Sequence, residues 1–216
     1  MTQTGEAAAG VTNETVTLEV PRESSDGVTL TNAEGGTFTI SIPNSQEAGK
    51  AVVSADGMVT YPGAEASATT VIPLEYGVQM LTTLASADAP TRYDYGVTLE
   101  DGQHIVVDAA SGGASIVNVD GSNAVEVAPA WAVDANGVNV PTRYKTDGQT
   151  LTQIIDHTST PGVAYPVVAD PFWIPFWVFR CLLGLGLSGP QIANAWATGT
   201  IWGGLGRAAL ACVRGR

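Results

Sequence analysis

The residues best suited to acid–base chemistry lie near position 157, where one of the two histidines follows an aspartate. Asp156, His157 and the later Asp170 form a candidate set in which carboxylates orient an imidazole as a general base. Thr158 or Ser159 would then be the nucleophile. Adjacent residues of a strand point to opposite faces, so Asp156 and His157 are not expected to face each other. We therefore interpret this segment as a strand end and predict that the protein is not an enzyme.

Candidate metal ligands are few. The other histidine, His104, follows an Asp-Gly turn and is expected to begin a strand, and two histidines exclude a three-histidine zinc site. Two acidic turns, 120–123 and 134–137, carry oxygen atoms of the type that calcium prefers. Neither belongs to a twelve-residue loop that ends in glutamate, and turn chemistry explains both. We predict no metal and no cofactor.

Cys181 and Cys212 are the second chemically reactive pair. We predict helices over 176–187 and 201–213, with the chain turning at Gly189-Pro190 between them. An antiparallel arrangement of these helices would bring the two cysteines together. A disulfide that closes about thirty residues would restrict the unfolded chain by roughly 3 to 4 kcal/mol in the loop-entropy model. We predict this disulfide, and the alternative is two buried thiols.

The C-terminal segment 172–216 differs in composition and charge from the residues before it. It carries four arginines, no acidic residue and four of the five tryptophans, whereas residues 1–171 carry all 21 acidic side chains and five basic ones. The formal charges of the two parts are therefore +4 and −16, and the net charge of −12 disfavours nucleic-acid binding. A change this abrupt indicates two parts with different partners.

The same segment combines apolar, aromatic and arginine side chains, which is typical of adsorption on an anionic membrane surface. Its first apolar run, 172–187, is shorter than the roughly twenty residues that a membrane-spanning helix needs. We predict contact with a membrane surface; the alternatives are docking on the protein's own β-domain and self-association. The residues predicted to make these contacts are Phe172, Trp173, Phe176, Trp177, Arg180, Trp196, Trp202, Arg207 and Arg214.

The residues before 172 have the pattern of an antiparallel all-β domain. Short runs such as 15–20 alternate apolar and polar residues, and Asp-Gly and Asn-Gly pairs lie between the runs. We predict a mainly β, antiparallel, sandwich-like domain over 15–171, a flexible leader over 1–14 and a helical hairpin module over 172–216. Strands are expected at 15–20, 37–42, 51–54, 58–61, 69–74, 77–84, 91–99, 104–108, 115–119, 124–127, 141–145 and 150–156.

The closing run Tyr165-Pro166-Val167-Val168-Ala169-Asp170-Pro171, preceded by 128–131, 134–137 and 156–157, resembles that of a group of exported actinobacterial β-rich proteins. Residues 58–171 are also similar to the β-domain that precedes the repeats in some secreted polymorphic toxins. The resemblance implies an exported carrier or display domain with a variable segment after the closing proline. The chain departs from the toxin pattern because it has no repeat cage and no recognisable nuclease or deaminase domain.

Sparse lysine, abundant threonine, serine, glycine and aspartate, and a cysteine pair fit a secreted or cell-envelope protein. The alternative is a cytosolic protein with two buried thiols. We expect a non-enzymatic exported bacterial protein whose acidic β-domain carries a membrane-active C-terminal module like that of a bacteriocin or toxin. The alternative function is a cell-envelope structural or adhesion module whose C-terminal helices mediate self-assembly.

Overall fold

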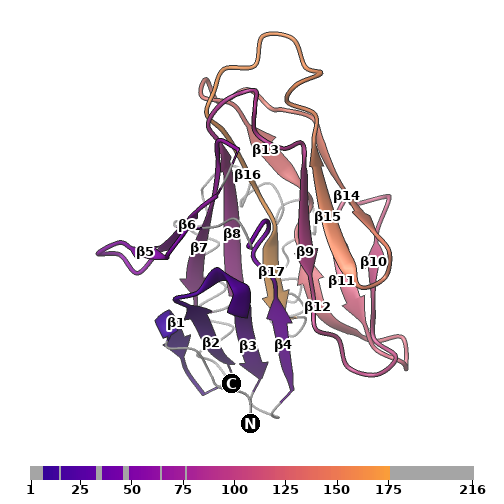
Figure 1. Ribbon diagram of the computed structural model, residues 1–216. Helices are drawn as coiled ribbons and strands as arrows, with labels where there is room; N and C mark the ends of the chain where they lie inside the picture. The colour runs from indigo at the N-terminus through magenta and orange to yellow at the C-terminus, as the bar shows by residue number, and fades with distance from the viewer. Residues whose placement is uncertain are drawn as a thin grey trace.

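The computed structural model describes residues 7–14, 16–32, 36–45, 49–63, 65–75 and 77–175, and these are mainly β (Figure 1). The prediction of a mainly β, antiparallel fold is confirmed. In the part of the chain that the structure describes, no helix is long and apolar enough to cross a membrane. The elements are β1 (Ala7–Thr12), β2 (Val16–Pro21), the 3-10 turn η1 (Ser24–Asp26), β3 (Val28–Asn32), β4 (Thr37–Ile40), β5 (Val52–Val53), β6 (Val59–Pro62), β7 (Ser67–Leu74), β8 (Gly77–Leu84), β9 (Arg92–Gly96), β10 (His104–Val107), β11 (Ala114–Val117), β12 (Asn123–Val127), β13 (Trp131–Val133), β14 (Thr142–Thr146), β15 (Thr150–Ile155), β16 (Val167–Asp170) and β17 (Phe172–Pro175).

The strands form three antiparallel sheets. A four-stranded sheet has the order β1-β2-β3-β4, and a three-stranded sheet has the order β14-β15-β9. A ten-stranded sheet follows the path β10-β11-β12-β17-β8-β7-β6-β5, with β16 beside β8 and β13 beside β16. The two smaller sheets are joined where the Ser41 N–H donates to Gly96 O at 2.8 Å and the Thr98 N–H donates to Thr39 O at 2.9 Å. Together they form a layer against the ten-stranded sheet, and one apolar core draws side chains from all three sheets.

The twelve strands expected from the sequence all overlap strands of the structure. The Asp56-Gly57 turn joins β5 to β6 as predicted, and Gly57 has a φ of 79° that the turn requires. Five strands were not predicted: β1, β3, β13, β16 and β17. Strands β13, β16 and β17 have only three or four residues, whereas β3 alternates apolar and polar residues and was missed in spite of this pattern.

The flexible leader predicted over 1–14 is wrong for Ala7–Thr12, which pair with β2 as strand β1. This strand was missed because it consists mostly of alanine and glycine, which have low strand propensity. Gly10 has a packing role there, since a Cβ at this position would lie 2.6 Å from the carbonyl oxygen of Leu18. The pairing of β1 with β2 therefore depends on a close approach of the two backbones, and not on an alternation of apolar and polar side chains along β1.

The predicted domain boundary at Pro171 is wrong, because the β-domain continues to Pro175. Strands β16 and β17 follow one another along β8: Ala169 lies opposite Thr82, and Phe172 lies opposite Gln79. Pro171 keeps the register, since its carbonyl oxygen accepts a hydrogen bond from the Met80 N–H at 3.1 Å. The helical module is not supported over 172–175, which are a strand. The rest of that module, with the predicted Cys181–Cys212 disulfide, lies outside the described residues.

Trp173 occupies the centre of this arrangement. Its side chain is fully buried, and its ring contacts Tyr95 of the three-stranded sheet edge-on, with 6.3 Å between the ring centroids. The backbone beside it is equally close-packed, because a Cβ at Gly77 would overlap the carbonyl oxygen of Trp173. Strand β17 thus packs against β8 at a point where only glycine fits.

We expect Trp173→Ala to lower the free energy of unfolding by about 3 to 5 kcal/mol, because it removes a fully buried aromatic side chain and leaves a cavity. Urea unfolding followed by circular dichroism measures this loss. Val119→Ala, at a side chain that is 78% exposed, is the control and should change stability by less than about 0.5 kcal/mol. Equal effects of the two substitutions would contradict the placement of Trp173 in the core.

Candidate functional site

His157 holds a loop in place and does not form the candidate acid–base pair with Asp156. The ring is 1% exposed; its Nε2 lies 3.3 Å from the carbonyl oxygen of Pro90, and its Nδ1 lies 2.8 Å from the Tyr165 hydroxyl. A carbonyl only accepts, so Nε2 carries the proton, and in a neutral ring Nδ1 accepts from Tyr165. Asp156 turns the other way and pairs with Arg143. The expectation that Asp156 and His157 point apart is confirmed.

The acidic turn at 134–137 uses its carboxylate to brace two loops. Asp134 Oδ1 accepts the backbone N–H groups of Asn136 and Val138, both at 2.9 Å, and Oδ2 accepts that of Ala164 at 3.1 Å. These backbone hydrogen bonds hold the pKa of Asp134 below its usual value. The turn at Asp120 is similar, since Oδ1 accepts from the backbone N–H and the hydroxyl of Ser122. The described residues contain no group of three or more His, Cys, Asp or Glu side chains that would hold a metal ion.

Asp170, in the closing run, is a carboxyl group buried within the protein. It is 1% exposed, and its Oδ2 accepts a hydrogen bond from Gln79 Nε2 at 3.0 Å. Its backbone carbonyl oxygen accepts from the hydroxyl of Tyr144, also at 3.0 Å. Two segments that lie 91 residues apart are therefore joined through Gln79 and Asp170. This role in packing differs from the catalytic role considered from the sequence, since the ring nitrogens of His157 bind other partners.

Burial raises the pKa of Asp170 to about 7, and the side chains of Gln79 and Trp131 act in the opposite direction. The indole N–H of Trp131 lowers the pKa of the Asp170 carboxyl group. Among the described residues, however, neither Trp131 Nε1 nor Asp170 Oδ1 makes a hydrogen bond of normal geometry. Desolvation of the charged form is thus the main cause of the shift. Burial therefore favours the protonated, neutral form of this carboxyl group.

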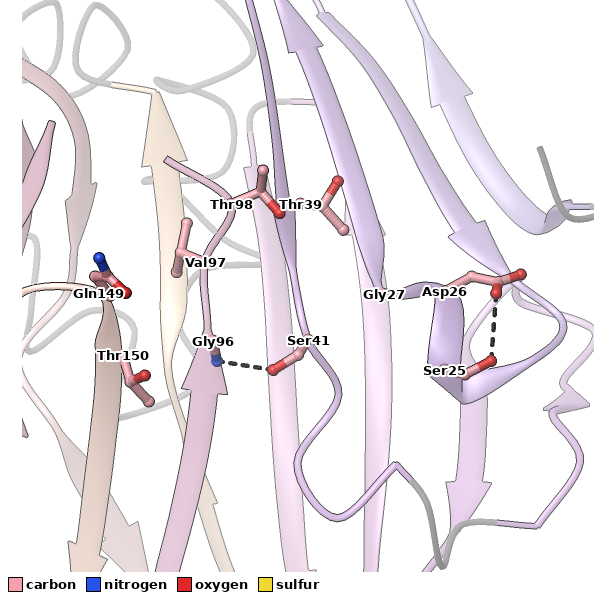
Figure 2. A pocket seen from close by; sticks show the side chains of 10 residues that line it. All are labelled: Ser25, Asp26, Gly27, Thr39, Ser41, Gly96, Val97, Thr98, Gln149 and Thr150. Atoms are coloured by element: carbon pink, nitrogen blue, oxygen red, sulfur yellow. Dashed lines mark hydrogen bonds between the residues drawn. The ribbon is translucent and has the colours of Figure 1, made fainter. Parts of the chain in front are cut away.

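A polar groove of about 400 Å³ lies where the four-stranded and three-stranded sheets meet (Figure 2). Its floor is fixed by two hydrogen bonds, because the Gly96 N–H donates to Ser41 Oγ at 2.7 Å and the Ser41 N–H donates to Gly96 O. Gly27, at a φ of 72°, lets η1 approach β4, since a Cβ there would lie 2.7 Å from Thr39 Cγ2. The lining residues are Ser25, Asp26, Gly27, Thr39, Ser41, Gly96, Val97, Thr98, Gln149 and Thr150.

The groove offers mainly hydrogen-bonding groups. Its lining carries five hydroxyls, one amide and one carboxylate, that of Asp26, and it contains no histidine, cysteine or aromatic residue. The carboxylate lies beside a hydroxyl, since Ser25 Oγ donates to Asp26 Oδ1 at 3.3 Å (Figure 2), but the lining has no ring on which a sugar would stack. The groove is not evident from the sequence, because its residues come from four separate stretches of the chain and single serines and threonines in strands give no pattern of their own.

The predicted contact residues fall into two groups. Phe172 and Trp173 are fully buried in strand β17, with Trp173 on the core face of the ten-stranded sheet and Phe172 on its other face. Contact of the C-terminal segment with a membrane, with the β-domain or with a second copy stays a prediction. The other predicted contacts lie outside the described residues: Phe176, Trp177, Arg180, Trp196, Trp202, Arg207 and Arg214.

Comparisons with protein-family models, with curated proteins and with solved structures find no match for this chain. The resemblance to exported actinobacterial β-domains therefore stays a prediction based on the closing run. The features of the chain that bear on function are its braced β-domain, its polar groove, the buried carboxyl group of Asp170 and the cationic C-terminal segment.

We expect Asp170→Asn to remove a pH dependence of stability. The unfolded aspartate has a pKa near 3.9 and the folded one about 7, so the free energy of unfolding falls as pH rises from about 4 to about 7, and the penalty is fully present above 7. Asparagine keeps the acceptor for Gln79 without the charge. The variant should be more stable than the wild type at pH 8, on the order of a few kcal/mol, and should lack this slope.

Urea unfolding at pH 4.5, 6 and 8 measures the difference between the two proteins. Asp56→Asn, on the exposed turn between β5 and β6, controls for the loss of one negative charge. Parallel pH profiles for the wild type and Asp170→Asn would show that this carboxyl group does not carry the effect.

Proposed function

We propose that this protein is an exported, non-enzymatic bacterial protein in which the acidic β-domain carries a membrane-active segment, residues 176–216. The observation that carries the proposal is the division of charge at the end of β17. The residues up to Pro175 hold all 21 acidic side chains, whereas the 41 residues after it hold four arginines and no acidic residue. A bacteriocin-like or toxin-like action on anionic membranes fits this division.

The two parts have opposite affinities for an anionic surface. Each arginine close to such a surface contributes about 1 kcal/mol of attraction, so the four arginines of the segment favour binding. The β-domain, with a formal charge of −16, is repelled by the same surface. The β-domain therefore keeps the protein soluble, and only the segment is suited to meet the membrane.

Strand β17 supports a carrier role because it holds the attachment point rigidly. It pairs with β8 on one side and with β12 on the other, and its Phe172, Trp173 and Ile174 side chains are fully buried. Movement of the chain after Pro175 would leave these pairings intact. The pairing of β17 with β8 and β12 therefore does not depend on residues after Pro175.

Dye release from vesicles of anionic and of zwitterionic lipid tests the proposal. We expect the full-length protein to release dye from anionic vesicles, and a chain that ends at Pro175 to release none. A chain that ends at Pro171 is unsuitable, because it lacks β17, the strand that joins β8 to β12. Release should fall with rising salt concentration, since charges attract the segment to the lipid.

A matched pair of charge variants locates the activity. Arg207→Gln with Arg214→Gln should lower release several-fold, whereas Lys50→Gln with Lys145→Gln, at exposed positions of the β-domain, should not lower it. No release over a wide range of protein concentration would count against a membrane-active segment. A defined oligomer in sedimentation that is lost in the chain ending at Pro175 would instead favour an envelope or adhesion module.

A further inference from the structure

The outer face of the ten-stranded sheet, on the side away from the core, carries a row of apolar side chains. Directly opposed residues of antiparallel strands share a face, which places Ile72, Gln79 and Phe172 in one row across β7, β8 and β17. Leu74 and Ile174 share this face, because each lies two residues further along its strand. We call the four apolar side chains the outer patch: Ile72, Leu74, Phe172 and Ile174.

The outer patch is buried although it faces away from the core. Phe172 and Ile174 are 0% exposed, and Ile72 and Leu74 are each 8% exposed. None of the four belongs to the core cluster that the three sheets share, and the two smaller sheets pack on the opposite face. Within the described ranges no sheet is stacked over the patch. A sheet face open to water would leave these side chains partly exposed, so another layer covers them.

Two carboxyl groups lie on the same face as the outer patch, and they determine which charge a covering layer should carry. Asp170 is bonded to Gln79 within the row, and Glu126 lies opposite Ile174 in the pairing of β12 with β17. The described hydrogen-bond partners of both carboxyl groups are neutral side chains. A covering layer with positive charge and no negative charge suits this face best.

The segment 176–216 meets both requirements and begins at the patch itself. It follows directly on β17, which lies between β8 and β12 in the middle of the sheet (Figure 1). Its 41 residues would span about 60 Å as helix, whereas the four strands β7, β8, β17 and β12 are about 19 Å wide together, so it is long enough to cross this part of the face twice. Attachment to β17 also gives it an effective concentration of about millimolar, which favours it over a second copy of the chain.

We propose that the segment 176–216 folds back over the outer patch of its own β-domain in the soluble protein and forms a third layer there. Its apolar residues cover Ile72, Leu74, Phe172 and Ile174, and its arginines lie toward the carboxyl groups of this face. This docking is separate from the proposed membrane activity, since it concerns the protein in water and is measured without lipid.

Limited trypsin digestion of the full-length protein tests the docking, because trypsin cleaves after arginine. In the wild type, cleavage after Arg180 and Arg207 should be slow compared with cleavage of the urea-unfolded protein. Leu74→Asp places a charge in the outer patch and should raise the rate of these cleavages about tenfold or more, because a detached segment is open to the protease. Mass spectrometry identifies the cleaved sites, and circular dichroism checks that the β-domain is folded.

Val119→Asp, at an exposed side chain, is the matched control and should leave the cleavage rates unchanged. Where Leu74→Asp does not fold, Leu74→Ser replaces it and should give the same change with a smaller amplitude. Equally fast cleavage after Arg180 and Arg207 in the wild type, the patch variant and the control would overturn the proposal. Protection that disappears on dilution of the wild type would also overturn it, because a second copy would then be the cover.

Discussion

The insertion of β17 between β8 and β12 is the constraint on which the rest of the structure depends. In the hydrogen-bonded order of the ten-stranded sheet, β5 to β8 lie on one side of β17 and β10 to β12 lie on the other. Backbone hydrogen bonds of Phe172–Pro175 therefore join two halves that are far apart in the sequence. The core depends on the same strand, since Trp173 fills the space next to Tyr95 of the opposite layer. The four residues Phe172–Pro175 thus supply both the strand pairing that joins the two halves of the sheet and a central side chain of the core.

The pattern of alternation explains which strands could be predicted. Where one face of a strand is buried, as in β2, apolar and polar residues alternate, and the strand was found to within one residue of its bounds. In Phe172–Ile174 both faces are buried, so the sequence reads as a continuous apolar run and was assigned to the C-terminal module. The charge change after Pro171 is real in the sequence, but the fold places the boundary four residues later.

The partners of the polar residues were harder to predict than the residues themselves. Both His157 and Asp170 were identified as chemically notable, and both are buried. Spacing in the sequence suggested that they act together, whereas the fold bonds one to Tyr165 and the other to Gln79. Contacts between residues as distant as Gln79 and Asp170 depend on the register of paired strands, which residue types alone do not determine.

The position of β17 in the chain has a consequence for the order in which the protein is made. Strands β8 and β12 leave the ribosome well before Phe172–Pro175. Until then each of them has an edge without its native neighbour, and the two halves of the sheet have no shared strand. The sheet closes only when nearly the whole described chain has emerged.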